Sequence, residues 1–435
     1  GEPARPHGRS RSRMSWAKHL RPCLAIAAAG ALLHGTPAPA DALQSAARAA
    51  TADASGPAPT LRSYRSEHYT FHTNLGRQET VPYGRHMDAV YQAYARRFAQ
   101  FGIQAPQPLP LYLLRTHEDY LAFMASHGID ARNSGGMFFV THTLHGLATW
   151  TQGPSRDRTF RVLQHEGFHQ FAFVALGPRL PVWANEGVAQ YFEDAVVIDG
   201  RMRTGQGSPE RLRRAQGAIR DGKTLPLTEL LALSPEQWTR TLRRDRAESG
   251  VLYAQAWSFA WFLIHGDQGA HTDKFLQYLA RVAEGQEPAL AMHNAFGRDG
   301  LTDLEPAWKR WVLDHPPNPL HHAAERMDFV AAALRYLSDN GQPAPDDIDE
   351  LRQRLTAMGF ILTRDTHGVP TAYYAHDPNL YRYRRADGHE ADLILLAPSG
   401  RNLPPRVYAP GLDPEPTLDW ERVDGQGLVT VTRYR

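Results

Sequence analysis

The residues with the clearest chemical potential are the two histidines and the glutamate of the run His165-Glu166-Gly167-Phe168-His169. On an α-helix, residues four positions apart lie on one face, one turn from each other, so His165 and His169 would point the same way. Two imidazoles at this spacing can bind one divalent metal ion, and Glu166 would lie close to a water on that metal. The run therefore predicts a helix that carries a metal site.

A second run supplies a candidate third ligand. Trp183-Ala184-Asn185-Glu186-Gly187-Val188-Ala189 has the pattern of another helix, and sixteen residues separate His169 from Glu186. That interval accommodates a helix end, a turn and the start of a returning helix, which would bring the Glu186 carboxylate to the metal. Two histidines and one carboxylate leave a fourth tetrahedral position for water, as in catalytic rather than structural zinc sites.

Each of these patterns has an ordinary alternative. A motif with three fixed positions arises by chance in roughly one chain in twenty of this length, and two histidines can share the face of any buried helix. Here the polar run lies between valine, leucine and phenylalanine residues, so its buried polar groups need partners that a metal would supply. For Glu186, the alternative is a surface glutamate.

The two runs together resemble the gluzincin metallopeptidases. They are most similar to the secreted bacterial group of the MA peptidase superfamily that is catalogued as the DUF1570-type domain. The resemblance is carried by His165-Glu166-x-x-His169 and by Trp183-x-Asn185-Glu186-Gly187-x-Ala189-x-Tyr191-Phe192-Glu193. It implies zinc (Zn2+) bound by His165, His169 and Glu186, with Glu166 as the general base.

The second run is also similar to that of zinc aminopeptidases in the same superfamily. Those enzymes have an interval two residues longer between the second histidine and the glutamate. They also carry a Gly-x-Met-Glu-Asn loop that binds the free amine of the substrate. The nearest match here, Gly135-Gly136-Met137-Phe138-Phe139, has no glutamate. The resemblance therefore favours cleavage within a peptide chain over removal of its first residue.

The resemblance also implies a mechanism. Zinc lowers the pKa of a bound water, and Glu166 takes the proton and passes it to the leaving amine. A further donor stabilises the developing oxyanion, and related gluzincins supply a tyrosine or histidine from downstream. We assign this role to Tyr253, for which packing is the alternative. Carboxylates that orient the histidines are expected, with Glu193 and Asp194 as candidates.

The segments before the metal helix alternate between strand and helix patterns. In chain order they are a strand at Glu67–Thr73, a helix from Tyr83 to Phe101, a strand at Pro110–Leu114, a helix from Thr116 to Met124, and strands at Met137–Val140 and Thr143–Trp150. Either of the last two strands could pair with an extended peptide. The order predicts an α+β, zincin-like fold, in which a small mixed or antiparallel sheet precedes a helical half that carries the HExxH run.

The helical half is predicted to begin with the metal helix, from an N-cap at Asp157 to Leu176. The further predicted helices are Val182–Asp194, one starting at Ser208, Val251–His265, Phe275–Ala283 and Leu304–Leu313, with a small hairpin at Val196–Arg203. The arginine-rich span Arg201–Arg246 favours a solvated helix face over a cleft wall for acidic ligands.

The proline-rich stretch Asp314–Pro319 is the clearest boundary in the chain. Beyond it, residues 320–435 are predicted to form a helical and then β-rich region. The expected helices are His322–Leu337 and Ile348–Met358, and the expected strands are Phe360–Thr363, Thr371–Tyr374, Asp392–Leu396 and Leu428–Thr432. We expect a small C-terminal β-rich appendage to the metallopeptidase domain at residues 61–315.

The N-terminal residues have the pattern of an export signal. In residues 1–40, Met14 precedes a short basic stretch, an apolar stretch from Cys23 to Leu33 and a small-x-small motif that ends at Ala40. Cleavage near Ala40 predicts a periplasmic or extracellular protein, with an uncleaved membrane anchor as the alternative. Residues 41–60 have the composition of a flexible linker.

Composition narrows the chemistry further. Cys23 is the only cysteine, so a mature chain without it would have no disulfide, no thiol nucleophile and no cysteine-ligated metal. The formal net charge of +2 gives no indication of a nucleic-acid partner, and no segment after the signal is apolar enough for a transmembrane helix. The sequence does not indicate an oligomeric state.

The sequence thus predicts an exported zinc-dependent peptidase that acts on a peptide or protein substrate. The alternative is a non-catalytic binding or scaffold protein of the cell envelope that keeps the zincin fold. The presence of Glu166 favours the enzyme, because a pure binding protein needs no general base.

Overall fold

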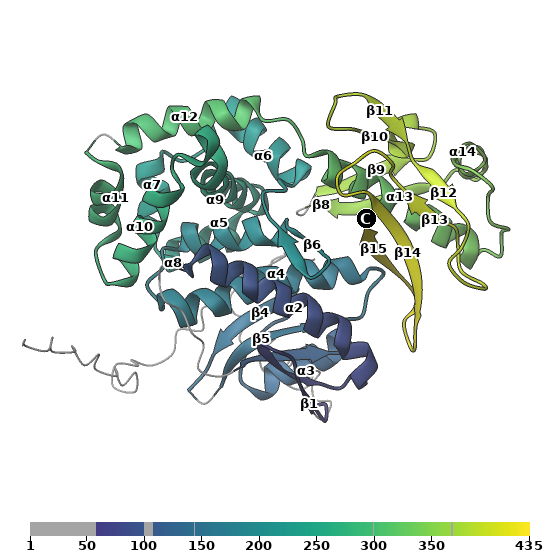
Figure 1. The fold of residues 1–435 in the computed structure, drawn as a ribbon, viewed down its shortest axis with the longest axis horizontal. Coiled ribbons are helices and arrows are strands. Elements are labelled where there is room, and N and C mark those ends of the chain that lie inside the picture. The colour runs from purple at the N-terminus through teal and green to yellow at the C-terminus, as the bar shows by residue number, and fades with distance from the viewer. Residues whose placement is uncertain (1–57, 100–107, 143, 299, 367–368) are drawn as a thin grey trace, which may run out of the picture.

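The computed structural model describes residues 58–99, 108–142, 144–298, 300–366 and 369–435. The predicted signal peptide and most of the predicted linker lie outside these residues. The described chain has an α+β fold, as predicted. Figure 1 shows a sheet at the bottom, a helical half above it and a C-terminal region beside both.

The N-terminal sheet is mixed and five-stranded, with the order β1-β2-β3-β5-β4. The outer pairs β1–β2 and β5–β4 are antiparallel, whereas β2–β3 and β3–β5 are parallel. The strands are β1 (Arg62–Arg65), β2 (Tyr69–Thr73), β3 (Leu109–Leu114), β4 (Gly136–Val140) and β5 (His145–Trp150). Strand β1 was not predicted, and β4 forms one edge of the sheet.

Side chains alternate between the two faces of this sheet and fill two cores. One face, with Leu111 and Leu113, packs in the main core together with helices α2 (Arg77–Arg97) and α4 (Arg156–Leu176). The other face, with Tyr112 and Leu114, packs against α3 (His117–Ser126). The sheet therefore supports α4, the helix that carries the HExxH run.

Helix α2 begins before the predicted start at Tyr83 and contains Pro82. Its first turn is stabilised because the Glu79 Oε2 atom accepts a hydrogen bond from the Gly76 amide at 2.8 Å. Pro82 removes one main-chain hydrogen bond from the second turn. The helix continues through it because its buried side packs in the main core, and such packing supplies most of the stability of a helix.

The helical half is built around α9 (Arg246–His265), whose residues from Ala254 to Ile264 are all buried. The remaining elements are α5 (Val182–Glu193), β6 (Val196–Ile198), β7 (Arg201–Arg203), α6 (Pro209–Arg220), α7 (Leu227–Ala232), α8 (Pro235–Arg244), the 3-10 turn η3 (Gly266–Gly269), α10 (Thr272–Ala283), α11 (Pro288–Phe296) and α12 (Gly300–Asp314). Helices α7, α8 and α11 were not predicted. They are short, and α8 buries only Trp238, so they carry little hydrophobic pattern.

The C-terminal region has a core of its own, to which Val196 and Ile198 of β6 also contribute. Its elements are α13 (Pro319–Asp339), α14 (Ile348–Ala357), β8 (Ile361–Thr366), β9 (Val369–Tyr374), η4 (Pro378–Tyr381), β10 (Arg382–Arg384), β11 (Glu390–Asp392), β12 (Ile394–Leu396), β13 (Arg406–Tyr408), β14 (Pro416–Val423) and β15 (Gly427–Tyr434). The predicted strand Asp392–Leu396 is wrong as one element. It is interrupted at buried Leu393, whose amide donates to the Tyr381 carbonyl, and its two halves join different sheets.

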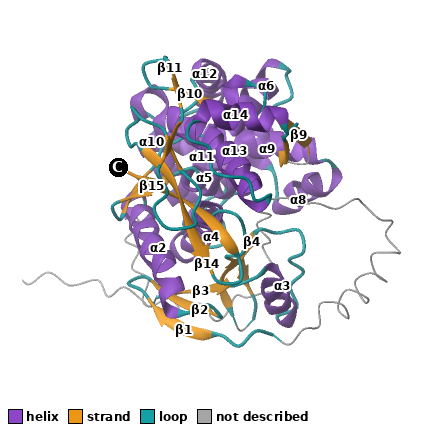
Figure 2. Cartoon of the chain, turned by 90° about the vertical axis from the view of Figure 1, so that its right-hand side faces the viewer, coloured by secondary structure: helices purple, strands orange, loops and turns teal. Residues whose placement is uncertain are grey.

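Strand β15 attaches this region to the start of α4, and Figure 2 shows β14 and β15 beside that helix. The Thr430 amide donates to the Pro154 carbonyl at 2.9 Å. The amide and hydroxyl of Thr432 donate to the Asp157 Oδ2 atom at 3.0 and 2.6 Å. We call these contacts the β15 clamp. They make the C-terminal region part of the support of the metal helix rather than a loose appendage.

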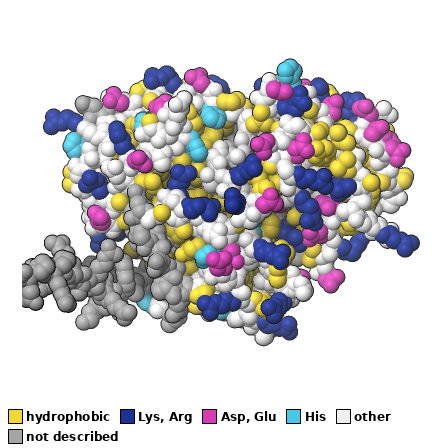
Figure 3. Space-filling view, in the orientation of Figure 1, with side chains coloured by type: hydrophobic (Ala, Val, Ile, Leu, Met, Phe, Trp, Pro, Cys, Tyr) yellow, Lys and Arg dark blue, Asp and Glu magenta, His cyan; other side chains and the backbone are white. Residues whose placement is uncertain are grey.

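The surface in Figure 3 carries basic and acidic side chains that are interspersed across the face shown. Among the described residues, none of the helices combines the length and apolar character needed to cross a bilayer.

Candidate metal centre

Helices α4 and α5 are joined by a short turn through Gly177, which has a positive φ of 77°. Such a backbone conformation suits glycine because it has no Cβ. The N-cap of α4 is Ser155, whose hydroxyl accepts from the Asp157 amide at 3.2 Å, and not Asp157 as predicted. Asp157 instead directs its carboxylate to the β15 clamp.

The structure brings His165, His169 and Glu186 together. All three are at least 95% buried, and one ligand atom from each lies within 4.8 Å of the others. The His165 Nε2 atom is 3.6 Å from Glu186 Oε2, and the His169 Nε2 atom is 3.8 Å from Glu186 Oε1. These separations are close to the roughly 3.4 Å between ligand atoms of a tetrahedral ion with bonds of about 2.1 Å.

Three atoms of this group have no hydrogen-bond partner among the described residues, namely His165 Nε2, His169 Nε2 and Glu186 Oε2. Buried polar atoms without partners are costly, and here all three face one another. Two imidazole nitrogens and a carboxylate oxygen form a donor set that suits a divalent metal such as zinc. The residues present therefore fit a metal ion.

The other ring nitrogen of each histidine is held by a neighbour. The His165 Nδ1–H donates to Glu193 Oε2 at 3.0 Å, and the His169 Nδ1–H donates to Asn185 Oδ1 at 3.0 Å. Because Nδ1 is the donor in each ring, Nε2 keeps its lone pair when the ring is neutral. Both rings are thus oriented with the metal-binding nitrogen toward Glu186.

Arg211 of α6 completes this support. Its guanidinium pairs with Glu193 Oε1 at 2.8 Å and with Asp194 Oδ1 at 2.5 Å. Asp194 also accepts from the Ser208 amide at 3.2 Å. Of the two predicted orienting carboxylates, Glu193 contacts a histidine, whereas Asp194 contacts Arg211 and reaches the histidines only through that residue and Glu193.

The carboxylates impose different protonation on the two histidines. Burial works to lower the pKa of His165, but Glu186 and Glu193 outweigh it and raise this pKa to about 10. Burial lowers the pKa of His169 to about 4, because Glu186 only partly offsets it. The pKa of Glu186 is lowered, since His169 and His165 outweigh the effect of burial. The centre thus holds a carboxylate ready to neutralise a cation.

Glu166 lies between the metal helix and strand β4. Its Oε2 atom accepts from the Phe138 amide at 2.7 Å, and the side chain is 99% buried. Burial raises the pKa of Glu166 to about 8, although His165 and the Phe138 amide act in the opposite direction. A carboxyl group with a pKa near neutrality can both accept and return a proton.

Tyr253 lies near the start of α9, where its ring makes an edge contact with Trp238 at 5.2 Å between centroids. Its pKa is raised well above the usual value, first by burial and then by the charges of Glu186 and Glu166. Tyr253 is therefore close enough to interact electrostatically with the carboxylates of Glu186 and Glu166. Its phenol remains protonated and can donate a hydrogen bond.

Gln164, which precedes His165, ties α4 to the end of α5. Its Nε2 atom donates to the carbonyls of Phe192 at 2.7 Å and Ala195 at 2.9 Å. Its Oε1 atom accepts from the His86 Nε2–H at 3.0 Å. Burial lowers the pKa of His86 to about 3, so this ring is neutral. The two ligand-bearing helices are thereby fixed relative to each other.

Sequence reasoning assigned no role to Asn185, Arg211, Gln164 or the Phe138 amide. Asn185 had a signal, because it lies beside Glu186 in the quoted run. The arginine-rich span was predicted to be solvated, whereas Arg211 forms partly buried ion pairs with Glu193 and Asp194. A main-chain donor such as Phe138 leaves no signature in a side-chain pattern.

Part of the chain matches a protein-family model. The family model described as "Protein of unknown function (DUF1570)" matches residues 160–288, which begin inside α4 and contain His165, His169, Glu186 and α9. The segment 160–288 is thus similar to the DUF1570 family, and it contains the buried group that could bind a metal. A search of curated proteins found no match.

Proposed function

We propose that this chain is a zinc-dependent peptidase of gluzincin type with a zincin-like fold, which hydrolyses peptide bonds within a chain. The proposal rests on the convergence of three buried, unpartnered ligand atoms on His165, His169 and Glu186. A structural zinc site has four protein ligands, whereas this group offers three and leaves a position for water or substrate. The glutamate next to the first histidine gives that position a general base.

Bound zinc would supply an acidified water and a polarised substrate carbonyl. Glu166 would take the proton from the attacking water and return it to the leaving amine, for which its pKa of about 8 is suited. Tyr253 would donate its phenol hydrogen bond to the oxyanion. Glu193 and Asn185 would keep both histidine rings oriented throughout.

The substrate would bind along the edge strand β4. In the described part of the chain β4 pairs only with β5, so its other edge is available to an extended peptide. Because the Phe138 amide donates to Glu166, a peptide on this edge would lie beside the general base. We further propose export to the periplasm or beyond, on the basis of the N-terminal sequence pattern.

The direct test compares wild type with Glu166→Gln. Metal content of the purified protein and cleavage of casein and a peptide library are measured for both. We expect about one zinc per chain in each protein and a fall in cleavage rate of roughly a thousandfold in the variant, because a general base contributes on the order of 10²–10⁴. The control is Glu229→Gln, since Glu229 is exposed on α7.

The outcomes distinguish the peptidase from the non-catalytic binding or scaffold protein. Bound zinc without any Glu166-dependent cleavage would favour the non-catalytic binding or scaffold protein. A purified protein that binds no zinc, even after zinc is supplied, would contradict both functions. Equal loss of cleavage in Glu229→Gln would assign the effect to folding rather than to the base.

A further inference from the structure

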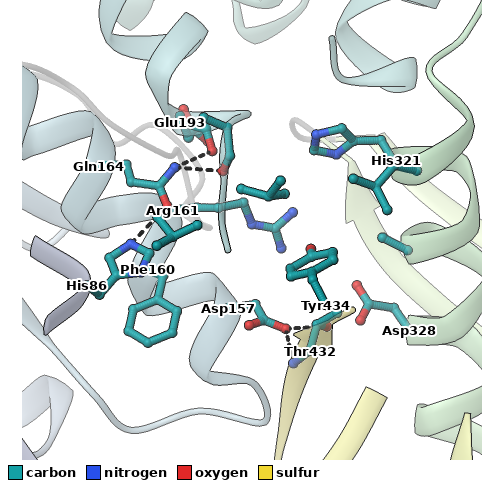
Figure 4. Close-up of a pocket in the computed structure, with 15 residues that line it drawn as sticks. His86, Asp157, Phe160, Arg161, Gln164, Glu193, His321, Asp328, Thr432 and Tyr434 are labelled. Atoms are coloured by element: carbon teal, nitrogen blue, oxygen red, sulfur yellow. Dashed lines mark hydrogen bonds between the residues drawn. The ribbon is translucent and has the colours of Figure 1, made fainter. Parts of the chain in front are cut away.

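A cavity of about 110 Å³ lies where the C-terminal region meets the metal helix (Figure 4). Its walls come from α2, α4, the end of α5, β6, α13 and the end of β15. At about 30 Å³ per water, the space corresponds to roughly four waters, which is the size of a very small organic molecule. The cavity is separate from the group formed by His165, His169 and Glu186, none of which lines it.

Three charged side chains face this space. Figure 4 shows Arg161 of α4 directed into the cavity, with Asp157 of the same helix and Asp328 of α13 on either side of Tyr434. Among the described residues, neither Arg161 nor Asp328 forms a hydrogen bond or a close ion pair with another side chain. The two groups nevertheless interact electrostatically, since burial raises the pKa of Asp328 and the charges of Arg161 and Arg364 act in the opposite direction. The opposite charges therefore face each other across a gap without contact.

Several other polar groups of the cavity already have partners. Glu193 pairs with Arg211 and His165. The His321 Nε2–H donates to the Asp194 carbonyl at 2.7 Å, and burial lowers the pKa of His321 to about 4, so it is neutral. Asp157 accepts the two Thr432 hydrogen bonds of the β15 clamp on Oδ2, which leaves its Oδ1 atom for another donor.

The charge arrangement restricts what can bind. A simple anion at Arg161 would face two carboxylates, and a simple cation at Asp328 would lie beside a guanidinium without giving that guanidinium a partner. A molecule that carries a negative and a positive charge close together would give a partner both to Arg161 and to the two carboxylates. The apolar side chains of Phe160, Leu320 and Ala324 leave room for a short aliphatic part.

We propose that this cavity binds a small free amino acid, with its carboxylate on Arg161 and its ammonium group between Asp328 and Asp157. Arginine suits a carboxylate because its two N–H groups can donate in parallel. The small volume selects amino acids of the size of glycine or alanine over peptides. This site does not depend on the proposed peptidase activity, since none of the metal-binding residues takes part.

The test is isothermal titration of the full chain with glycine and L-alanine, and with acetate and methylamine as ligands of one charge each. We expect saturable millimolar or tighter binding of the amino acids and roughly tenfold weaker binding of acetate and methylamine. Arg161→Met and Asp328→Asn should each weaken L-alanine binding by roughly tenfold. Arg310→Met should not, because Arg310 is exposed on α12.

A second variant and a metal-free sample keep the result interpretable. Arg161→Lys keeps the charge but loses the forked donor geometry, so it should also weaken binding if Arg161→Met does not fold. Amino-acid binding that vanishes on removal of metal by a chelator but survives Arg161→Met would belong to the metal centre and overturn the proposal. Equal affinity for methylamine or acetate, or no saturable binding of either amino acid, would also overturn it.

Discussion

Two hydrogen bonds decide which nitrogen each histidine presents to a metal. Glu193 holds the Nδ1–H of His165, and Asn185 holds that of His169. Without these acceptors each ring could rotate or change tautomer, and the Nε2 lone pairs would no longer converge. The affinity of the proposed centre for a metal would thus depend on two residues, Glu193 and Asn185, that are not among its candidate ligands.

We predict that Asn185→Ala weakens zinc affinity by roughly tenfold to a hundredfold, because ligand-orienting residues typically contribute on this scale. Competition with a chromophoric chelator measures the change directly. Asn74→Ala serves as the control, because the Asn74 side chain forms hydrogen bonds with Asp119 and with the Arg115 amide rather than with a histidine. Unchanged affinity in Asn185→Ala would show that the His169 ring is held by packing alone.

The ionisation of Asp157 makes the free energy of unfolding depend on pH, and the sign of this dependence follows from its pKa. Burial raises its pKa to about 6, although the Thr432 hydroxyl acts in the opposite direction. The unfolded value is about 3.9, so between about pH 4 and pH 6 the folded state holds a proton that the unfolded state lacks. The contribution of Asp157 to the free energy of unfolding therefore falls as pH rises through this window.

We predict that Asp157→Asn removes this pH-dependent contribution to the free energy of unfolding. Urea unfolding at several pH values between 4 and 7 should show that the stability difference between variant and wild type changes by up to about 1.4 kcal/mol per pH unit. The sign is specific, because the variant should gain relative to wild type as pH rises. A difference that is constant with pH would contradict the assigned ionisation.

At the scale of elements, helices α5 and α9 approach each other closely at Gly187. A Cβ on Gly187 would lie 2.4 Å from the Ala256 carbonyl oxygen, which is far inside van der Waals contact. Gly187 follows the ligand Glu186, so any displacement of α5 moves that carboxylate. The glycine therefore sets both the packing of the two helices and the position of the ligand.

We predict that Gly187→Ala lowers the free energy of unfolding by about 1–3 kcal/mol, as overpacking does, and also weakens zinc binding. Gly217→Ala is the matched control, because Gly217 is also helical but a Cβ added there would meet no atom within 4 Å. That control should be neutral or stabilising by up to about 1 kcal/mol. Thermal unfolding with and without zinc measures both effects.

Elements with strong local patterns were predictable and the rest were not. Apart from β1, the order of strands and helices before α4, and α4 and α5 themselves, follow from the periodicity of the sequence. His165, His169 and Glu186 lie close in sequence, so the group could be inferred from spacing. The role of Arg211 and the contact of Phe138 with Glu166 depend on tertiary packing, which no local pattern encodes.

At the scale of the whole molecule, the β15 clamp is one of several contacts that join the C-terminal region to the start of α4 and the end of α5. Beyond Thr430 and Thr432, an ion pair between Arg156 and Glu421 at 2.6 Å also links the start of α4 to the C-terminal sheet. His321 of α13 meanwhile holds the Asp194 carbonyl at the end of α5. Both helices of the metal centre are thus supported from the C-terminal region.

We predict that Thr432→Val destabilises the protein by about 1–3 kcal/mol, because it removes a hydrogen bond to a charged group and leaves Asp157 poorly satisfied. The residue keeps its shape, so packing changes little. Thr363→Val is the control, since Thr363 is exposed on β8 and should change stability by less than about 0.5 kcal/mol. Equal stability of the two variants in urea unfolding would mean that the clamp contributes nothing.

The β15 clamp also bears on the order in which the protein folds. The groups that orient the metal ligands lie within one helix pair and its neighbours, whereas the clamp joins residues 275 positions apart. Closing so long a loop is entropically costly and slow, while contacts between neighbouring helices form early. An early folding species would then hold the ligand-bearing helices with the start of α4 still unsecured. In such a species a metal could bind before the C-terminal region docks. Metal binding and the docking of the C-terminal region would then occur at different times during folding.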